Sequence, residues 1–383
     1  MSISDILVIL VAVVGGLPIL FLVARRVDLA GGYASFLYVW HTAGCVAFYL
    51  YDAVRPVDAT MYYLKSTNEG LSWAVGTGFI YKLTSVIAGG FGLSKLSTFL
   101  VYNWMGLLGL LLLAKTVEVC STNLRGWRKS CAIGLLLLPG LSFWTGGIGK
   151  DGIAFLASAL AVYTLVCRSR HFGGLAVAAV LMATVRPHMA LLLIGSGAVA
   201  MSLSSGSRRG TQLLTFVALF AGVLLALPFV GEYVGIGEIR LDSVQDFVDK
   251  RQRALGGTGL DLAGMGPLER IFSFLFRPLF FDASGALGLV SSTENLIVLA
   301  TCLICGKNFF RRTIRNRHPA VIYAMTFVFV GVLILSTTVP NVGLAMRQKI
   351  MIFPPLYLLI ALSLAAPSRK LRRDPRRSHS GRI

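Results

Sequence analysis

Long apolar runs, separated by short polar segments, dominate the pattern of hydrophobic and polar positions along the chain. A hydrocarbon core of about 30 Å needs about 20 apolar residues for each helical span. The runs are continuous and do not alternate in segments of about 10 residues, so we reject a transmembrane β-barrel. The pattern therefore predicts an all-α polytopic transmembrane bundle of about eleven spans. These lie at about 3–24, 32–51, 97–117, 130–148, 152–167, 172–185, 189–204, 211–230, 286–304, 319–338 and 350–366.

The composition supports this interpretation. Hydrophobic residues make up 55% of the 383 residues, charged residues only 14%, and the mean hydropathy is +0.74. A soluble domain carries about 25% charged residues, so these values exclude a soluble enzyme, a fibrous protein and a disordered chain. We expect one transmembrane domain over 1–366, followed by a basic, disordered tail over 367–383.

The segments between the predicted spans alternate in charge. One set is strongly basic: Arg25, Arg26, Arg125, Arg128, Lys129, Arg168, Arg170, Arg208, Arg209, Lys307, Arg311, Arg312, Arg315, Arg317 and the tail. The other set holds most of the acids: Asp52, Asp58, Glu69, Asp151, Glu232, Glu238, Asp242, Asp246, Asp249, Asp261, Glu269 and Asp282. Because Lys and Arg collect on the cytoplasmic side, we expect the C-terminus inside and the N-terminus outside. The net charge of +19 then follows from topology, and no nucleic-acid partner is expected.

Two of the predicted outer segments are long, at about 52–96 and 231–285. The second half of the first segment is amphipathic and too rich in glycine and polar residues to span the membrane. It predicts one or two helices that lie at the membrane interface. The second segment ends in a phenylalanine-rich stretch around Arg277 and Pro278, which suits a membrane surface where an anionic lipid headgroup is held.

The shortest pair of predicted spans meets at Arg186-Pro187-His188. A helix of about 14 residues is about 21 Å long, which is less than the hydrocarbon core. Arg186 and His188 are therefore expected at or below the outer membrane surface, where ionisable groups are commonly functional. The alternative is a helix-ending proline with an arginine that reaches back to the surface.

A glycine-rich turn with a lysine joins the fourth and fifth predicted spans, in the sequence FWTGGIGKD that ends at Asp151. It departs from a Walker A phosphate loop, which needs a glycine where Trp144 stands and a serine or threonine where Asp151 stands. The remaining interpretations are a turn that presents backbone N–H groups and Lys150 to an anion, or a plain turn.

Basic residues on the outer side oppose the usual distribution of charge, which suggests a local anion such as phosphate. They come from separate outer loops: Lys150, Arg186, Arg277, Arg347 and Lys349. The first outer loop adds two carboxylates, Asp52 and Asp58. Cations can neutralise a phosphate leaving group, and a carboxylate can take the proton of an acceptor hydroxyl. Transfer from a lipid-linked phosphosugar requires this combination.

Several short motifs follow one another in a recognisable order: DATMYY from Asp58, GTGFIYKL, FGLSK, FWTGGIGKD, Arg186-Pro187, LFRP at Arg277, and N-x-G-x-x-x-R ending at Arg347. Over roughly 30–365, this order resembles bacterial integral-membrane glycosyltransferases of the GT-C type and polysaccharide polymerases of the Wzy and EpsG kind. The resemblance implies a polyprenyl-phosphate or polyprenyl-diphosphate sugar donor and catalysis on the extracytoplasmic face of the bacterial inner membrane. It also implies a role in making surface polysaccharide, such as exopolysaccharide or O-antigen.

The resemblance implies roles for individual residues. In such transferases an acid of the first outer loop is the base, which falls on Asp58 or, as the second choice, Asp52. In such polymerases outer-loop arginines bind the diphosphate, which points to Arg186 and Arg347. With the other residues singled out in the outer loops, donor phosphate and lipid binding are expected of Lys150, Arg186, His188, Arg277, Arg347 and Lys349, and sugar contacts of Tyr62 and Trp144. The extra span before the Asp-bearing loop, and the absence of a large soluble C-terminal domain, favour a polymerase or compact transferase. Expected partners are membrane lipid and other polysaccharide-assembly proteins.

Two other classes compete with this hexosyltransferase hypothesis. A secondary transporter or lipid-linked sugar flippase would need ionisable groups near the midplane and an internal repeat; we find no repeat, and Glu294 is the one clear acid within a span. A non-catalytic scaffold would explain the apolar bulk but not the outer charges. No cofactor is expected, because the five histidines are scattered and form no H-E-x-x-H motif. The resemblance leaves a divalent cation open.

Overall fold

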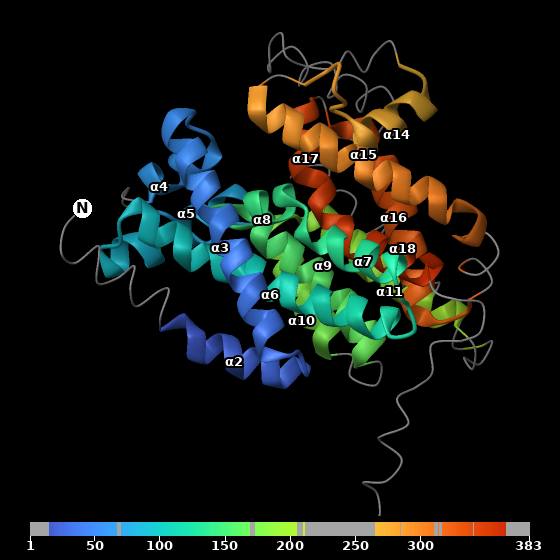
Figure 1. The fold of residues 1–383 in the computed structure, drawn as a ribbon. Coiled ribbons are helices and arrows are strands. Elements are labelled where there is room, and N and C mark those ends of the chain that lie inside the picture. The colour runs from blue at the N-terminus through green and yellow to red at the C-terminus, as the bar shows by residue number, and fades with distance from the viewer. Residues whose placement is uncertain are drawn as a thin grey trace, which may run out of the picture.

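The computed structural model describes residues 15–66, 70–168, 173–204, 210, 265–283, 285–309, 313, 316–339 and 341–364. Every regular element in these ranges is a helix, as predicted (Figure 1). Some predicted features lie outside the described residues: the span 211–230, the outer segment up to residue 264, the tail 367–383, and the first part of the span 3–24.

Helices α2 (Gly16–Val27) and α3 (Gly31–Val54) open the described chain. Two short helices follow α3, namely α4 (Asp58–Lys65) and α5 (Thr77–Thr84). A π-helical turn, η1 (Ser85–Gly89), continues directly from α5. The first outer segment therefore forms short helices, as predicted, in place of a span.

Two long helices, α6 (Lys95–Ser121) and α9 (Lys150–Cys167), pack along each other near the centre of the molecule (Figure 1). Their most apolar stretches are 67% and 78% buried, against 28% for α15. The backbones approach closely because α6 carries Gly109, where a Cβ atom would lie 2.7 Å from the ring of Phe155. Small residues at helix contacts permit this kind of approach.

The predicted span 130–148 is broken in the structure. It consists of α7 (Trp127–Gly134), the 3-10 turn η2 (Leu135–Leu137) and α8 (Pro139–Thr145). Proline lacks a backbone N–H and fixes φ, so Pro139 can begin a helix but cannot continue one. The residue before it, Leu138, is extended, as the ring of a following proline demands.

Helices α10 (Gly173–Val185) and α11 (Pro187–Leu203) form the predicted short pair, and Arg186 stands at their vertex. Helix α10 packs on α9, and α11 packs on α16 (Pro319–Thr338). The prediction of two short helices that meet at an arginine is confirmed.

The C-terminal part contains α14 (Pro267–Phe276), α15 (Gly285–Asn308), α17 (Val342–Gln348), the 3-10 turn η4 (Lys349–Met351) and α18 (Phe353–Leu364). A bend of 66° separates Val342–Met351, which we call the elbow, from α18. The hydroxyl of Ser158 in α9 donates to the carbonyl oxygen of Met351 at 2.7 Å. The elbow is thereby tied to the central helix.

Four described helices are long and apolar enough to cross a membrane: α6, α9, α15 as far as Gly306, and α16. The elbow and α18 make a fifth if the bent pair is counted as one span, and α10 and α11 are apolar but shorter. These helices indicate a membrane protein. They do not confirm the predicted count of about eleven spans.

Candidate functional site

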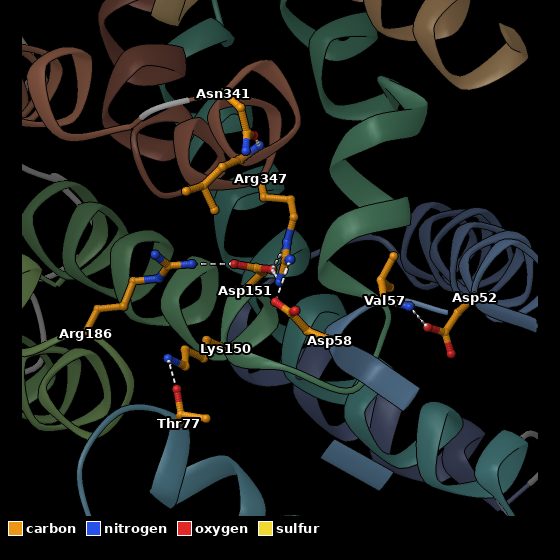
Figure 2. A network of polar contacts seen from close by, with 10 residues as sticks. Asp52, Val57, Asp58, Thr77, Lys150, Asp151, Arg186, Asn341 and Arg347 are labelled. Atoms are coloured by element: carbon orange, nitrogen blue, oxygen red, sulfur yellow. Dashed lines mark hydrogen bonds and ion pairs between the residues drawn. The ribbon is translucent and has the colours of Figure 1, made fainter. Parts of the chain in front are cut away.

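The carboxylate of Asp151 lies at the centre of a group of charges that comes from four different elements (Figure 2). Its Oδ1 accepts a hydrogen bond from Arg186 Nη2 at 2.7 Å, and its Oδ2 accepts from Arg347 Nε and Nη2 at 3.0 and 2.9 Å. Arg347 Nη1 also donates to Asp58 Oδ2 at 2.8 Å. We call Asp58, Lys150, Asp151, Arg186 and Arg347 the Asp151 cluster.

Helix ends position these side chains. Asp58 begins α4, Asp151 lies in the first turn of α9, and Arg186 is the residue before α11. Arg347 lies in the last turn of α17, and the side chain of Asn341 caps the start of that helix by accepting a backbone hydrogen bond at 2.7 Å. The Asn341-to-Arg347 motif is therefore a capped short helix that presents an arginine. Acids at helix starts and a base at a helix end also suit the helix dipoles.

Lys150 links the cluster to the first outer segment. Its Nζ donates to Thr77 Oγ1 at 2.7 Å (Figure 2). The backbone N–H of Gly76 donates to the carbonyl oxygen of Thr184 at 2.7 Å, two residues before Arg186. These two bonds hold the start of α5 beside the cluster.

The cluster is graded from buried to exposed. The side chain of Asp151 is 6% exposed, that of Arg186 10%, that of Arg347 17% and that of Asp58 57%. A buried charge is costly unless it is paired, so Asp151 and the two arginines stabilise one another. Asp58 is held through one oxygen at the exposed rim, and it is therefore the carboxylate best able to change partners.

Positive charge and N–H donors are in excess in the cluster. Lys150, Arg186 and Arg347 face two carboxylates, those of Asp58 and Asp151. Arg186 Nε is buried and has no hydrogen-bond partner among the described residues. Because buried donors normally have partners, this arrangement is suited to an anion with several acceptor oxygens.

Two aromatic residues predicted to contact a sugar lie against the cluster. The Cζ atom of Arg347 lies 5.7 Å from the ring centroid of Trp144, in a cation–π contact. Tyr62 packs edge-on against Tyr81, with ring centroids 5.5 Å apart. Burial and the neighbouring Asp58 raise the pKa of Tyr62 above its ordinary value, so its hydroxyl stays protonated as a hydrogen-bond donor.

Close packing explains a glycine in the turn before Lys150. A Cβ atom on Gly147 would lie 2.2 Å from the ring of Phe48 in α3, and residues 146–149 are all buried. The turn therefore acts through packing, and it places Lys150 and Asp151 at the start of α9.

Asp52 lies apart from the cluster (Figure 2). It is fully buried, forms an ion pair with Lys95 at 2.6 Å, and accepts hydrogen bonds from the backbone N–H of Val57 at 2.9 Å and from Thr60 Oγ1 at 2.8 Å. These contacts tie the end of α3 to α4 and α6. Of the two predicted bases, Asp58 is thus the one that lies in the cluster.

Two other predicted phosphate ligands, Lys349 and Arg277, have partners outside the cluster. Lys349 donates to Asn295 Oδ1 in α15. Arg277 forms an ion pair with Asp282, and its Nε–Oδ2 distance is 2.8 Å. His188 is the second residue of α11. Three of the six predicted phosphate ligands, Lys150, Arg186 and Arg347, belong to the cluster.

Sequence reasoning did not single out Asp151 as a site residue, although it organises the cluster. A usable signal was present, because an acid in the first turn of an apolar helix requires a buried partner. The partners themselves, at positions 186 and 347, could not be recognised from spacing.

Within the described ranges, no group of three or more His, Cys, Asp or Glu residues could hold a metal ion. No family model matches this chain, and neither a curated protein nor a solved structure matches it. The function is therefore inferred from the chemistry of the site.

Proposed function

We propose that the protein is an integral-membrane glycosyltransferase or repeat-unit polymerase that uses a polyprenyl-phosphate- or polyprenyl-diphosphate-linked sugar. One observation carries this proposal: a single buried carboxylate holds Arg186 and Arg347 together, with spare N–H donors, at the ends of apolar helices. Arginine forks match phosphate oxygens in geometry and charge. Phosphate chemistry beside apolar helices suits an amphiphilic, lipid-linked substrate.

In this proposal, Lys150, Arg186 and Arg347 bind the donor phosphate. They neutralise the charge that develops on it as the bond from the anomeric carbon to the phosphate oxygen breaks. Asp58 takes the proton of the attacking acceptor hydroxyl. A phosphate on Arg347 would displace Asp58 from its single hydrogen bond there and free it for this role, while Asp151 stays ionised and fixes both guanidinium groups.

We further propose about eleven spans in the bacterial inner membrane, with the N-terminus outside, the C-terminus in the cytoplasm and the site on the extracytoplasmic face. The charge pattern assigns the segments that carry Asp58, Asp151, Arg186 and Arg347 to one side, and these residues meet in the structure. Exposed Met61 of α4 supports an interfacial position for the short helices, where the polyprenyl tail would enter. The product would be a surface polysaccharide.

The proposal is tested by the length profile of surface polysaccharide in a deletion strain. We expect wild type to restore the ladder and Arg347→Gln to leave single repeat units. Arg277→Gln is the matched control, because Arg277 is also an arginine but is paired with Asp282 outside the cluster, and it should restore the ladder. Loss of all glycan, with Asp58→Asn inactive, would indicate a transferase that acts earlier. A normal ladder in the deletion strain would contradict the polysaccharide assignment.

A secondary transporter or lipid-linked sugar flippase is the second candidate, and one observation favours it. Glu294 and Lys349 line the same cavity, and Glu294 lies in the candidate span α15. Ionisable groups at membrane depth often mark transport pathways. An assay of glycosidic-bond formation by the purified protein in detergent distinguishes the two candidates, because a detergent micelle has no two compartments between which a substrate could be transported. Formation of a glycosidic bond in detergent supports the enzyme, and its absence with lipid-linked substrate present supports the transporter.

A further inference from the structure

A small cavity shares the residue Trp144 with the Asp151 cluster, because Trp144 lines the cavity and also contacts Arg347. Four segments form it: α8, the middle of α15, the elbow and the first residue of α18. Its lining includes Trp144, Ser291, Glu294, Asn295, Lys349 and Phe353. We call it the Lys349 cavity.

Lys349 is buried with spare hydrogen-bond donors. It is 5% exposed, and its one hydrogen bond within the described residues goes to the amide oxygen of Asn295. An ammonium group has three donors, and a neutral amide oxygen does not compensate its charge. Burial of such a group is expensive without further partners.

The carboxylate of Glu294 lines the same cavity with spare acceptors. Its Oε1 accepts a hydrogen bond from the backbone N–H of Gly140. In the described part of the chain, Glu294 and Lys349 are not within ion-pair distance of each other. A cation that can donate and an anion that can accept thus face a shared space without closing on each other.

The size of the cavity limits what can bind. There is space for about one water molecule, so a phosphate group is too large. A hydroxyl group fits, and it can accept from Lys349 while it donates to Glu294. A sugar ring does not fit in this space, so the ring that carries the hydroxyl group would stay outside the cavity.

The cavity adjoins the proposed phosphate site. Trp144 contacts Arg347 and also lines the cavity. Lys349 follows Arg347 by two residues in the elbow. The shared residue is therefore Trp144: a molecule that binds Arg347 through a phosphate and extends along Trp144 would bring its next group to the cavity.

We propose that the Lys349 cavity binds one hydroxyl group of a saccharide, with Lys349 donating to the hydroxyl oxygen and Glu294 accepting its hydrogen. The role of that saccharide as donor or acceptor sugar rests on the proposed function, whereas its binding does not require transfer chemistry. Glu294 and Lys349 are specificity-determining residues in this assignment.

The test uses the full-length protein in nanodiscs of phosphatidylethanolamine and phosphatidylglycerol. Two probes are titrated separately: inorganic pyrophosphate, and the methyl glycosides of glucose, galactose, mannose and N-acetylglucosamine. We expect Glu294→Gln and Lys349→Met to weaken glycoside binding at least about tenfold, a loss of about 1.4 kcal/mol, without affecting pyrophosphate. Arg347→Gln should do the reverse. Ser292→Ala is the matched control, because Ser292 lies two residues before Glu294 in α15 but donates its hydrogen bond to the carbonyl oxygen of Gly288 in the same helix.

A deoxy-glycoside series makes the test independent of folding defects in the variants. Removal of one particular hydroxyl should weaken binding to the wild type as much as Glu294→Gln does, and the two losses should not add. Unchanged glycoside binding in both variants, or no glycoside binding to the wild type, overturns the cavity assignment. A wild-type protein that binds glycosides but not pyrophosphate, with glycoside binding weakened in the Glu294 and Lys349 variants, would overturn the proposed function and leave the cavity assignment in place.

Discussion

Arg186 and Arg347 donate to opposite oxygens of the same carboxylate, that of Asp151, at 2.7 and 2.9 Å. Arg186 precedes α11, whereas Arg347 lies in the elbow that leads to α18. A single residue in the first turn of α9 therefore sets the separation of two guanidinium groups. The distance between the two guanidinium groups determines which phosphate oxygens a ligand could place against both of them.

Asp151→Asn should destabilise the protein strongly. The substitution keeps the shape of the side chain but leaves two largely buried guanidinium groups without their shared counter-charge, for an expected loss of about 3–5 kcal/mol. The rim residue Asp58 is 57% exposed, so Asp58→Asn should cost about 1 kcal/mol or less. Unfolding in detergent, followed by circular dichroism, compares the two variants. Equal losses would contradict the graded cluster.

Substitution of Asp58 should lower the activity more than substitution of Asp52, whereas substitution of Asp52 should lower the stability more. Asp58→Asn should lower glycosyl transfer about a hundredfold or more if Asp58 is the base. Asp52→Asn removes a charge that is paired with Lys95, so it should lower stability by about 1–3 kcal/mol and retain most activity per folded molecule. Turnover normalised to folded protein gives the comparison. A larger activity loss in Asp52→Asn would exchange the two roles.

Gly147→Ala should disrupt the site through packing. The new Cβ atom would lie 2.2 Å from the ring of Phe48, and overpacking of this kind costs about 1–3 kcal/mol. Gly134→Ala is the control, because Gly134 ends α7 and a Cβ there would meet nothing within 4 Å. Helix propensity makes that change neutral or stabilising by up to about 1 kcal/mol. Melting temperatures decide, and a combined Phe48→Leu change should recover part of the loss in Gly147→Ala.

Acid should weaken the connection between α14 and α15. A hydrogen bond from Arg277 holds the pKa of Asp282 below its ordinary value of 3.8. The ion pair therefore stabilises the folded state fully above that value, and the contribution is lost as the pH falls through the lower, folded-state pKa. Stability measured from about pH 6 down to about pH 3 should fall more steeply in wild type than in Asp282→Asn. If the stability of wild type and of Asp282→Asn fell in parallel with pH, the loss of stability in acid would not come from Asp282.

The helical class and the Arg186 vertex were predictable because they depend on local rules. Run length sets the class, and two short apolar runs separated by Arg186-Pro187 place the arginine at the vertex between two helices. The meeting of Arg186, Arg347 and Asp58 on Asp151 was not predictable in the same way. It depends on how α4, α9, α11 and the elbow pack, and no single segment carries that information.

The separation of Lys349 from Arg347 could have been predicted from the sequence. Residues two apart in a helix differ by about 200° in direction, so Arg347 and Lys349 could not both face one phosphate if the loop is helical. The capping pattern from Asn341 pointed to such a helix. The role of the glycine turn could not be predicted in this way. Close packing against Phe48 and anion binding by backbone N–H groups both require glycine, so the residue type does not distinguish the two roles.

Because the elbow meets α18 at a bend of 66°, a tilt of α18 that the elbow follows would displace the residues of the elbow. Arg347 lies five residues from the pivot near Ile352, or about 7–8 Å along a helix. A tilt of about 10° would move its backbone by about 1.3 Å, enough to break a hydrogen bond of 2.8 Å. A small tilt of α18 relative to α4 and α9 would therefore change the contacts of Arg347 with both Asp58 and Asp151.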